Sequence, residues 1–197
     1  MATQLSFRTA VPADIPLLLP LIRSAYRGEA SRKGWTTEAD LLDDQRIDEA
    51  GLLAKITEPH GVVLTVFETS DAATTTTTTQ PLVLDEKAEE RPLACCELLR
   101  RGDGQVAYFG LFAVDPDRQA GGVGRRVLAH AEEFARAAWG VGAVEMCVIW
   151  TRRELIAWYE RRGYAKTGER REFPYDGLVE GPALRDDLWF EVLEKKL

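Results

Sequence analysis

A short run of glycines after an apolar stretch carries the clearest chemistry in this sequence. The run reads Gln119-Ala-Gly-Gly-Val-Gly-Arg125, and the apolar stretch before it ends at Val114. Glycines let the backbone approach a ligand closely, and they expose N–H groups that a following helix aligns with its own dipole. Such a turn favours a phosphate or a pyrophosphate. The adjacent guanidiniums of Arg118 and Arg126 add to the preference for an anion.

Other phosphate-binding patterns fit this run less well. The Gly-Lys-Ser/Thr of a P-loop is missing. A dinucleotide turn needs a third glycine where Val127 stands, and only Glu145 lies near the place of its acidic partner. A glycine turn that merely begins a helix is a further alternative. The charge balance favours an anionic ligand, because residues 118–171 hold 11 bases and 6 acids in a chain whose net charge is −7.

Two motifs in sequence order resemble the GNAT superfamily of N-acyltransferases. Residues 119–124, with the pattern Q-x-x-G-x-G, are similar to its acetyl-CoA signature Q/R-x-x-G-x-G/A. Residues 154–164, ELIAWYERRGY, are similar to its later motif, a helix that ends in Y-E-x-x-G-F/Y, and residues 108–114 resemble its fourth strand. The resemblance covers nearly the whole chain. It implies acetyl-CoA, or coenzyme A after reaction, as cosubstrate and direct transfer of the acetyl group to an amine.

The resemblance also implies roles for single residues. Tyr159 matches the tyrosine that protonates the leaving sulfur. Tyr108 stands where many relatives carry a glutamate base, so the base is open: Glu97 through a water, or an amine already neutral in bulk. Glu97 as a surface charge is an equal alternative. Arg152 stands where relatives often place an asparagine that contacts pantetheine. The cofactor contacts implied are Phe112, Ala113, Val114, Arg118, Gln119, Ala120, Gly121, Gly122, Val123, Gly124, Arg125 and Arg152.

The acceptor must be recognised by the segments outside these motifs. They are residues 26–35, a helix expected over 37–48 and the last hairpin around 173–181. Residues 38–58 hold seven acids and two bases, a balance that favours a cationic amine or is simply a solvated face. We expect a primary amine of a small molecule or peptide. A CoA-binding sensor or scaffold is the rival hypothesis, because Tyr108 supplies no carboxylate.

The elements that position these groups follow from periodicity and from the turn residues. Asp14 is expected to cap a helix that Pro20 breaks or kinks. Six consecutive threonines at 74–79 predict a low-complexity insertion over about 70–91. The fold class is mixed α/β, one domain over 1–197, with a mostly antiparallel twisted sheet of about seven strands and about four helices. Strands are expected at 5–9, 62–68, 93–99, 106–114, 143–150, 164–173 and 188–193, and helices at 15–26, 37–46, 122–139 and 152–162.

Composition excludes several classes of protein. With a net charge of −7, the chain lacks the basic surface that nucleic acid needs. Three cysteines and two histidines make neither a disulfide framework nor a zinc or other metal site. No apolar run reaches the roughly 20 residues of a membrane span. The first ten residues resemble no targeting peptide. We therefore expect a cytoplasmic or nucleocytoplasmic protein, monomeric or homodimeric.

Overall fold

A computed structural model describes residues 4–69, 91–102 and 104–197. The predicted insertion at 70–91, with its threonine run, lies almost entirely outside the described residues. Its character therefore stays a prediction.

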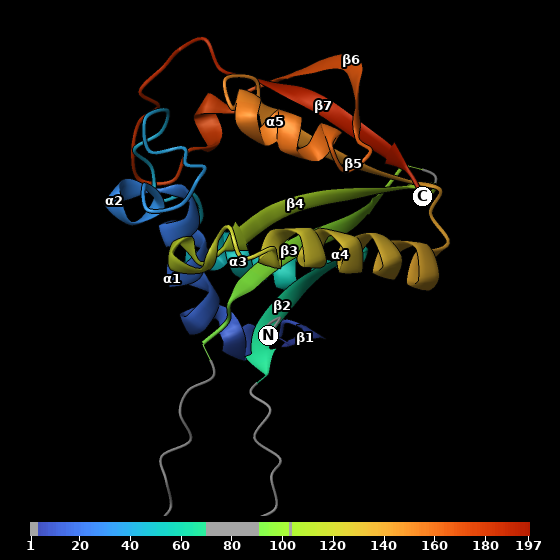
Figure 1. The fold of residues 1–197 in the computed structure, drawn as a ribbon. Coiled ribbons are helices and arrows are strands. Elements are labelled where there is room, and N and C mark those ends of the chain that lie inside the picture. The colour runs from blue at the N-terminus through green and yellow to red at the C-terminus, as the bar shows by residue number, and fades with distance from the viewer. Residues whose placement is uncertain (1–3, 70–90, 103) are drawn as a thin grey trace, which may run out of the picture.

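Seven strands form one sheet in the order β1-β2-β3-β4-β5-β7-β6 (Figure 1). Every neighbouring pair is antiparallel except β4 and β5, which are parallel. The expected mixed α/β fold with a mostly antiparallel seven-stranded sheet is thereby confirmed. The strands are β1 (Gln4–Thr9), β2 (Gly61–Thr69), β3 (Ala94–Arg101), β4 (Val106–Val114), β5 (Ala143–Ile149), β6 (Ala165–Glu172) and β7 (Trp189–Lys196).

The helices cover the two faces of this sheet (Figure 1). Apolar residues of α4 and α5 pack with one set of strand residues, and those of α1 and α3 pack with another. Strand residues next to one another in sequence, such as Cys95 and Cys96, belong to different cores, as the alternation of a strand requires. The helices are α1 (Ile15–Tyr26), α2 (Gly28–Ser31), α3 (Glu49–Ile56), α4 (Val123–Trp139) and α5 (Arg153–Glu160).

Three local expectations at the N-terminal end are wrong. Residues 37–46 form turns instead of a helix, because Glu38 and Asp44 turn inward to Arg27 and Leu42 bridges Ala183. Pro20 does not break helix α1, since the buried apolar face of the helix holds it against the sheet; the alternative of a kink at Pro20 stays a prediction. The carboxylate of Asp14 does not cap α1.

Instead, Asp14 serves the segment before the helix. Its carboxylate accepts the N–H of Val11 at 2.8 Å and pairs with Arg8 at 2.6 Å. The hydrogen bond from Arg8 outweighs burial and lowers the pKa of Asp14. Asp14 therefore fixes the chain's turn from β1 into α1.

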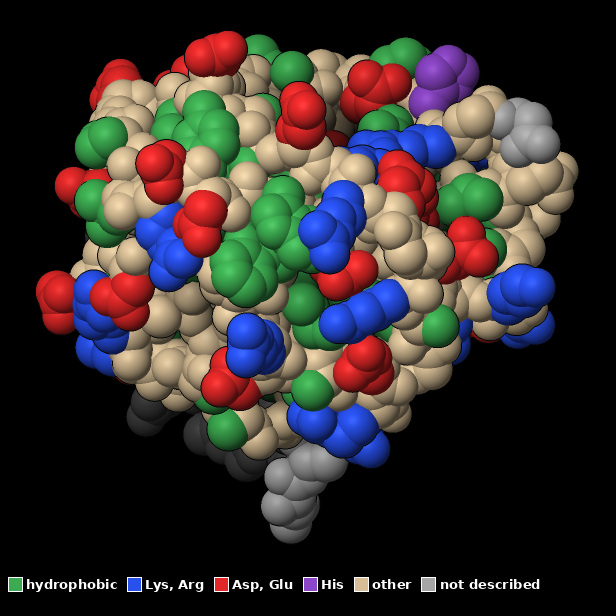
Figure 2. Space-filling model, turned by 90° about the horizontal axis from the view of Figure 1, so that it is seen from above, with side chains coloured by type: hydrophobic (Ala, Val, Ile, Leu, Met, Phe, Trp, Pro, Cys, Tyr) green, Lys and Arg blue, Asp and Glu red, His purple; other side chains and the backbone are tan. Residues whose placement is uncertain are grey.

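The face above α5 and β7 mixes charges of both signs (Figure 2). Basic and acidic side chains alternate over it, with small apolar patches between them. No helix among the described residues is long and apolar enough to cross a membrane.

The parallel strands β4 and β5 pair only along their first three residues, 106–108 with 143–145, and then diverge. The opening is visible in Figure 1, where the two strands converge near the C-terminus and separate away from it. Beyond Tyr108, β4 thus has a strand neighbour on one side only. The N–H of Asp115 donates to Leu93 on the β3 side, so by alternation Phe112 and Val114 turn their N–H groups toward the opening.

Candidate active site

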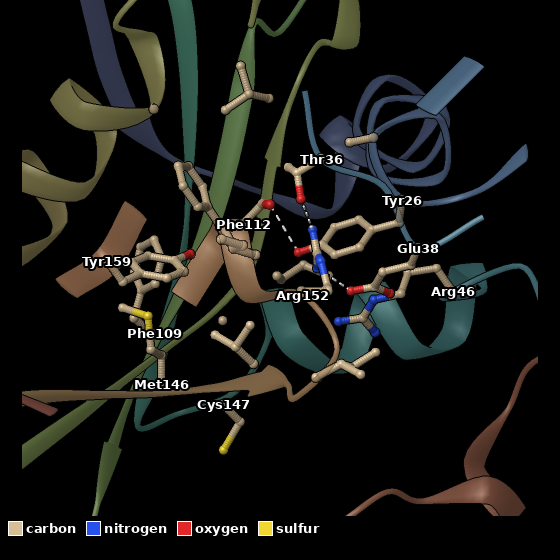
Figure 3. A pocket seen from close by; sticks show the side chains of 18 of the residues that line it. Tyr26, Thr36, Glu38, Arg46, Phe109, Phe112, Met146, Cys147, Arg152 and Tyr159 are labelled. Carbon is tan, nitrogen blue, oxygen red and sulfur yellow. Dashed lines mark hydrogen bonds and ion pairs between the residues drawn. The ribbon is translucent and has the colours of Figure 1, made fainter. Parts of the chain in front are cut away.

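The opening between β4 and β5 holds a pocket of about 340 Å³. It runs from the glycine turn, past Tyr159 of α5, to a group of charged side chains on residues 26–46 (Figure 3). Tyr26 and Trp35, the two ends of the 26–35 segment expected to recognise the acceptor, line it. We call its two parts the turn end, beside residues 119–125, and the loop end, beside residues 26–46.

At the turn end, the backbone is shaped for close approach of a ligand. Ala120 and Gly122 have positive φ angles of 66° and 79°, and α4 begins directly after Gly122. A Cβ on Gly124 would lie 3.4 Å from the ring of Phe112 and 3.6 Å from that of Trp158. A side-chain carbon at 124 would thus meet these rings at ordinary van der Waals distance, which places the first turn of α4 directly at the pocket wall.

Gln119, the first residue of the motif, holds the turn in place. Its Nε2 donates to the carbonyl of Val114 at 3.2 Å, and its Oε1 accepts the N–H of Trp35 at 3.2 Å. A Cβ on Gly34 would lie 2.4 Å from that same Oε1, so this contact requires glycine at 34. The side chain of Gln119 thus joins the end of β4 to the loop that carries Trp35.

Two arginines at the turn end have no acidic partner within residues 4–69, 91–102 and 104–197. Arg125 and Arg162 both line the pocket, and Arg162 lies 3.5 Å over the ring of Trp158. Burial and the neighbouring positive charges of Arg161 and Arg125 lower the pKa of the Arg162 guanidinium. Mutual repulsion of this kind is relieved by an anion, so the turn end fits a phosphate group. Arg118 instead pairs with Glu68 at 2.6 Å, outside the pocket lining.

Tyr159 lies in the middle of the pocket and is almost fully buried (4% exposed). Its ring packs edge-on against Trp158 at 5.0 Å and Tyr164 at 5.7 Å. Its hydroxyl points into the pocket interior (Figure 3). Burial raises the pKa of Tyr159, so the phenol stays protonated at neutral and alkaline pH and can donate its proton.

Of the two other predicted catalytic residues, Tyr108 shares the pocket with Tyr159 and Glu97 does not. Tyr108 lines the pocket beneath Arg101, whose guanidinium is 3.9 Å from its ring centre, and burial raises its pKa to about 12. Glu97 is buried behind Gly110, and its carboxylate pairs with Lys55 at 2.8 Å. Glu97 is not part of the pocket lining. Its role as a base stays a prediction.

At the loop end, two buried acids and two buried arginines form an ionic chain. Arg27 pairs with Asp44 and with Glu38, both at 2.6 Å. Glu38 also pairs with Arg152, whose second nitrogen donates to Thr36 at 2.8 Å. Arg152, predicted to contact the cofactor, is thus held by the 26–46 segment (Figure 3).

Within this chain of ion pairs, Glu38 is an anion and not a proton acceptor. Burial alone would raise the pKa of its carboxyl, but the guanidiniums around it, chiefly that of Arg152, outweigh burial and lower the pKa. The acidic stretch that seemed able to attract a cationic amine is therefore partly neutralised. The sequence shows only that Glu38 and Asp44 are charged. It does not show that they pair with Arg27 and Arg152, because those partners are not their neighbours in the chain.

Tyr26 and Cys147 also line the pocket, whereas His130 lies outside its lining. Tyr26 donates its hydroxyl to the carbonyl of Phe112 at 2.9 Å. Cys147 is half-buried, and burial raises the pKa of its thiol. The ring of His130 stacks on Phe7 at 3.8 Å. The described residues contain no cluster of side chains able to hold a metal ion.

Two solved N-acetyltransferases share the fold of this chain. The spermidine N-acetyltransferase of Vibrio cholerae, solved with CoA and spermine, has a TM-score of 0.63 at 13% identity, over 98% of this chain and 95% of that one. The PaiA N-acetyltransferase of Thermoplasma acidophilum, solved with coenzyme A, has a TM-score of 0.65 at 16% identity, over 98% and 99%. No curated protein sequence matches the chain.

The family is given by the sequence itself. Residues 52–164 match the model of the acetyltransferase (GNAT) family. This chain belongs to that family, as its two motifs had indicated.

Proposed function

We propose that this protein transfers an acetyl group from acetyl-CoA directly to the primary amine of a small molecule or peptide. One observation carries the proposal: a single pocket connects the glycine turn, the free edge of β4 and the protonated hydroxyl of Tyr159. These are the groups that a CoA thioester and its leaving sulfur require.

The turn end supports binding of coenzyme A. The N–H groups of residues 119–125 and the guanidiniums of Arg125 and Arg162 would take the pyrophosphate. The N–H groups of Phe112 and Val114, turned to the opening, would take pantetheine carbonyls as an added strand does. The carbonyls of Phe112 and Val114 already accept bonds from Tyr26 and Gln119.

The proposed reaction needs one proton donor and one neutral amine. The amine nitrogen attacks the thioester carbonyl, a tetrahedral adduct forms, and the carbon–sulfur bond breaks as the C–N bond is kept. Tyr159 gives its proton to the departing sulfur and regains one from the amine nitrogen through water, so protons balance. Because Lys55 holds the carboxylate of Glu97, we favour an amine that arrives neutral over one deprotonated by Glu97.

The cell compartment and assembly remain part of the proposal. Cys95, Cys96 and Cys147 are free, which supports a reducing compartment such as the cytoplasm. A monomer or a homodimer is expected from the sequence, and gel filtration with light scattering would decide between them.

The test is binding followed by turnover. At acetyl-CoA 100-fold above Kd, linkage adds about 2.7 kcal/mol to the free energy of unfolding, which raises Tm by roughly 5–10 °C. NAD is the control and should give no shift. Release of free CoA thiol with a panel of amines, spermidine included, then tests the transfer. A shift with acetyl-CoA but no thiol release with any amine would support a CoA sensor instead.

A further inference from the structure

Arg46 is a cation of the loop end whose charge has no partner in the ionic chain. Its guanidinium lies 4.9 Å from the ring centre of Tyr26, and the side chain lines the pocket (Figure 3). Among the residues that the structure describes, no carboxylate pairs with it and no carbonyl accepts from it. Arg27 and Arg152, its neighbours, each have an acidic partner.

The charge count around Arg46 leaves one positive charge over. The loop end contributes three arginines against the two carboxylates of Glu38 and Asp44. Two further acids, Glu97 and Glu145, pair with Lys55 and Arg171. Burial alone would lower the pKa of the Arg46 guanidinium, but the charges of Glu38 and Asp44 stabilise it at a distance and help to raise that pKa. These carboxylates are paired directly with Arg27 and Arg152, so the donors of Arg46 face the pocket for an anionic ligand.

The backbone holds Arg46 in an uncommon conformation. Its φ angle is +67°, which costs free energy for a residue other than glycine. The carboxylate of Asp44 accepts its N–H at 3.0 Å and fixes this turn. Strain that neighbouring contacts maintain is typical of sites that bind or react.

We infer that the acceptor amine itself carries an anionic group, a carboxylate or a phosphate, which Arg46 binds. The inference rests on the proposed acetyl transfer and names its substrate class. Arg46 lies across the pocket from Tyr159 (Figure 3) and near Tyr108, at the loop end. An anion on Arg46 would therefore belong to the acceptor, since Arg125 and Arg162 already serve the turn end.

The rest of the loop end fits such an acceptor better than a polycation. The one positive charge left over at the loop end repels a chain of ammonium groups, while Phe173, Leu178 and Phe190 offer apolar contact. An amine with one acidic group and an apolar body, such as an amino acid or the end of a peptide, matches both features.

Matched pairs of amines test this inference. We would compare kcat/KM for phenylalanine with 2-phenylethylamine, and for 2-aminoethylphosphonate with ethylamine, with spermidine as the polycation. We expect the anionic member of at least one pair to be preferred about 10- to 100-fold, the range for a hydrogen-bonded ion pair. The pair with the larger ratio of kcat/KM values shows whether Arg46 prefers a carboxylate or a phosphate-like group.

Variants assign the preference to Arg46. Arg46→Gln should reduce the ratio to near one, and Arg46→Lys should restore part of it. Arg136→Gln, an exposed arginine of α4, should leave the ratio unchanged. The acetyl-CoA shift in Tm confirms that each variant is folded.

The outcomes separate the two proposals. A ratio near one in the unchanged protein, or a ratio that survives Arg46→Gln, would overturn the anion-binding inference alone. A preference for spermidine would overturn it as well. Failure to acetylate any amine, with acetyl-CoA bound, would overturn the proposed function.

Discussion

The turn end and the loop end of the pocket are built in opposite ways. The backbone of the turn end comes from one continuous stretch, from β4 into α4. It offers N–H groups beside Arg125 and Arg162, which have no acidic partner among the described residues. The loop end joins residues 26–46 to Arg152, more than a hundred positions away, and its arginines are mostly paired. A cosubstrate site can thus be local, whereas the acceptor site depends on distant segments meeting.

The difference has an electrostatic reason. Backbone N–H groups and guanidiniums that water can reach are hydrated when no anion is bound, so leaving them without a ligand costs little free energy. A desolvated arginine needs a carboxylate beside it, so the loop end carries its own counterions and leaves only Arg46 for a ligand.

The largest effect is expected at Tyr159, between the two ends. Tyr159→Phe should lower kcat about 10²- to 10⁴-fold, because the leaving sulfur loses its proton donor. The acetyl-CoA shift in Tm should persist. Tyr164→Phe is the matched control: it loses a bond to Glu132 and should affect stability more than kcat. An unchanged kcat in Tyr159→Phe would remove Tyr159 from the acid role.

The loop end should be the more fragile of the two. Glu38→Gln removes a buried anion that holds Arg27 and Arg152. We expect a loss of about 3 kcal/mol in the free energy of unfolding, or a drop in Tm of roughly 10 °C. Glu29→Gln, at a side chain 91% exposed, should change little. Thermal unfolding decides, and equal Tm values for both variants would contradict an ionic loop end.

At the turn end, a substitution should change the affinity for acetyl-CoA rather than the stability of the fold. Arg162→Gln should raise the Kd for acetyl-CoA about tenfold, the effect of losing one charged hydrogen bond, and leave kcat nearly unchanged. Arg153→Gln, exposed on the same helix, is the control. Calorimetric titration with coenzyme A measures both. A Kd that stays the same would place the pyrophosphate away from Arg162.

The smallest effect concerns alkaline pH. A tyrosine with a pKa of about 10 would lose its proton, and kcat would fall, above that pH. Burial raises the pKa of Tyr159, so the donor stays protonated and kcat at saturating acceptor should be flat between about pH 9 and about 10.5. A fall near pH 10 would show that the donor phenol is solvated in the working enzyme.

Sequence reasoning succeeded where neighbours in the chain decide the structure. The bounds of β4 and the start of α4 follow from apolar alternation and from the glycines after it. The helix expected over 37–46 failed because charge pattern alone cannot show that Glu38 and Asp44 face inward. Arg162 and Arg46 gave no signal as ligands, since an arginine outside a motif is indistinguishable from a solvated one.

The sequence by itself determined the family, the fold class and the place of the glycine turn. A motif of adjacent residues fixes its own backbone conformation, so the group that it binds can be predicted from the sequence. Only the tertiary structure decided which arginines are in ion pairs, that Glu97 pairs with Lys55, and that Arg46 lines the pocket without a direct acidic partner among the described residues. Pairing of charges depends on distances between segments far apart in the chain, and those distances exist only once the sheet has formed.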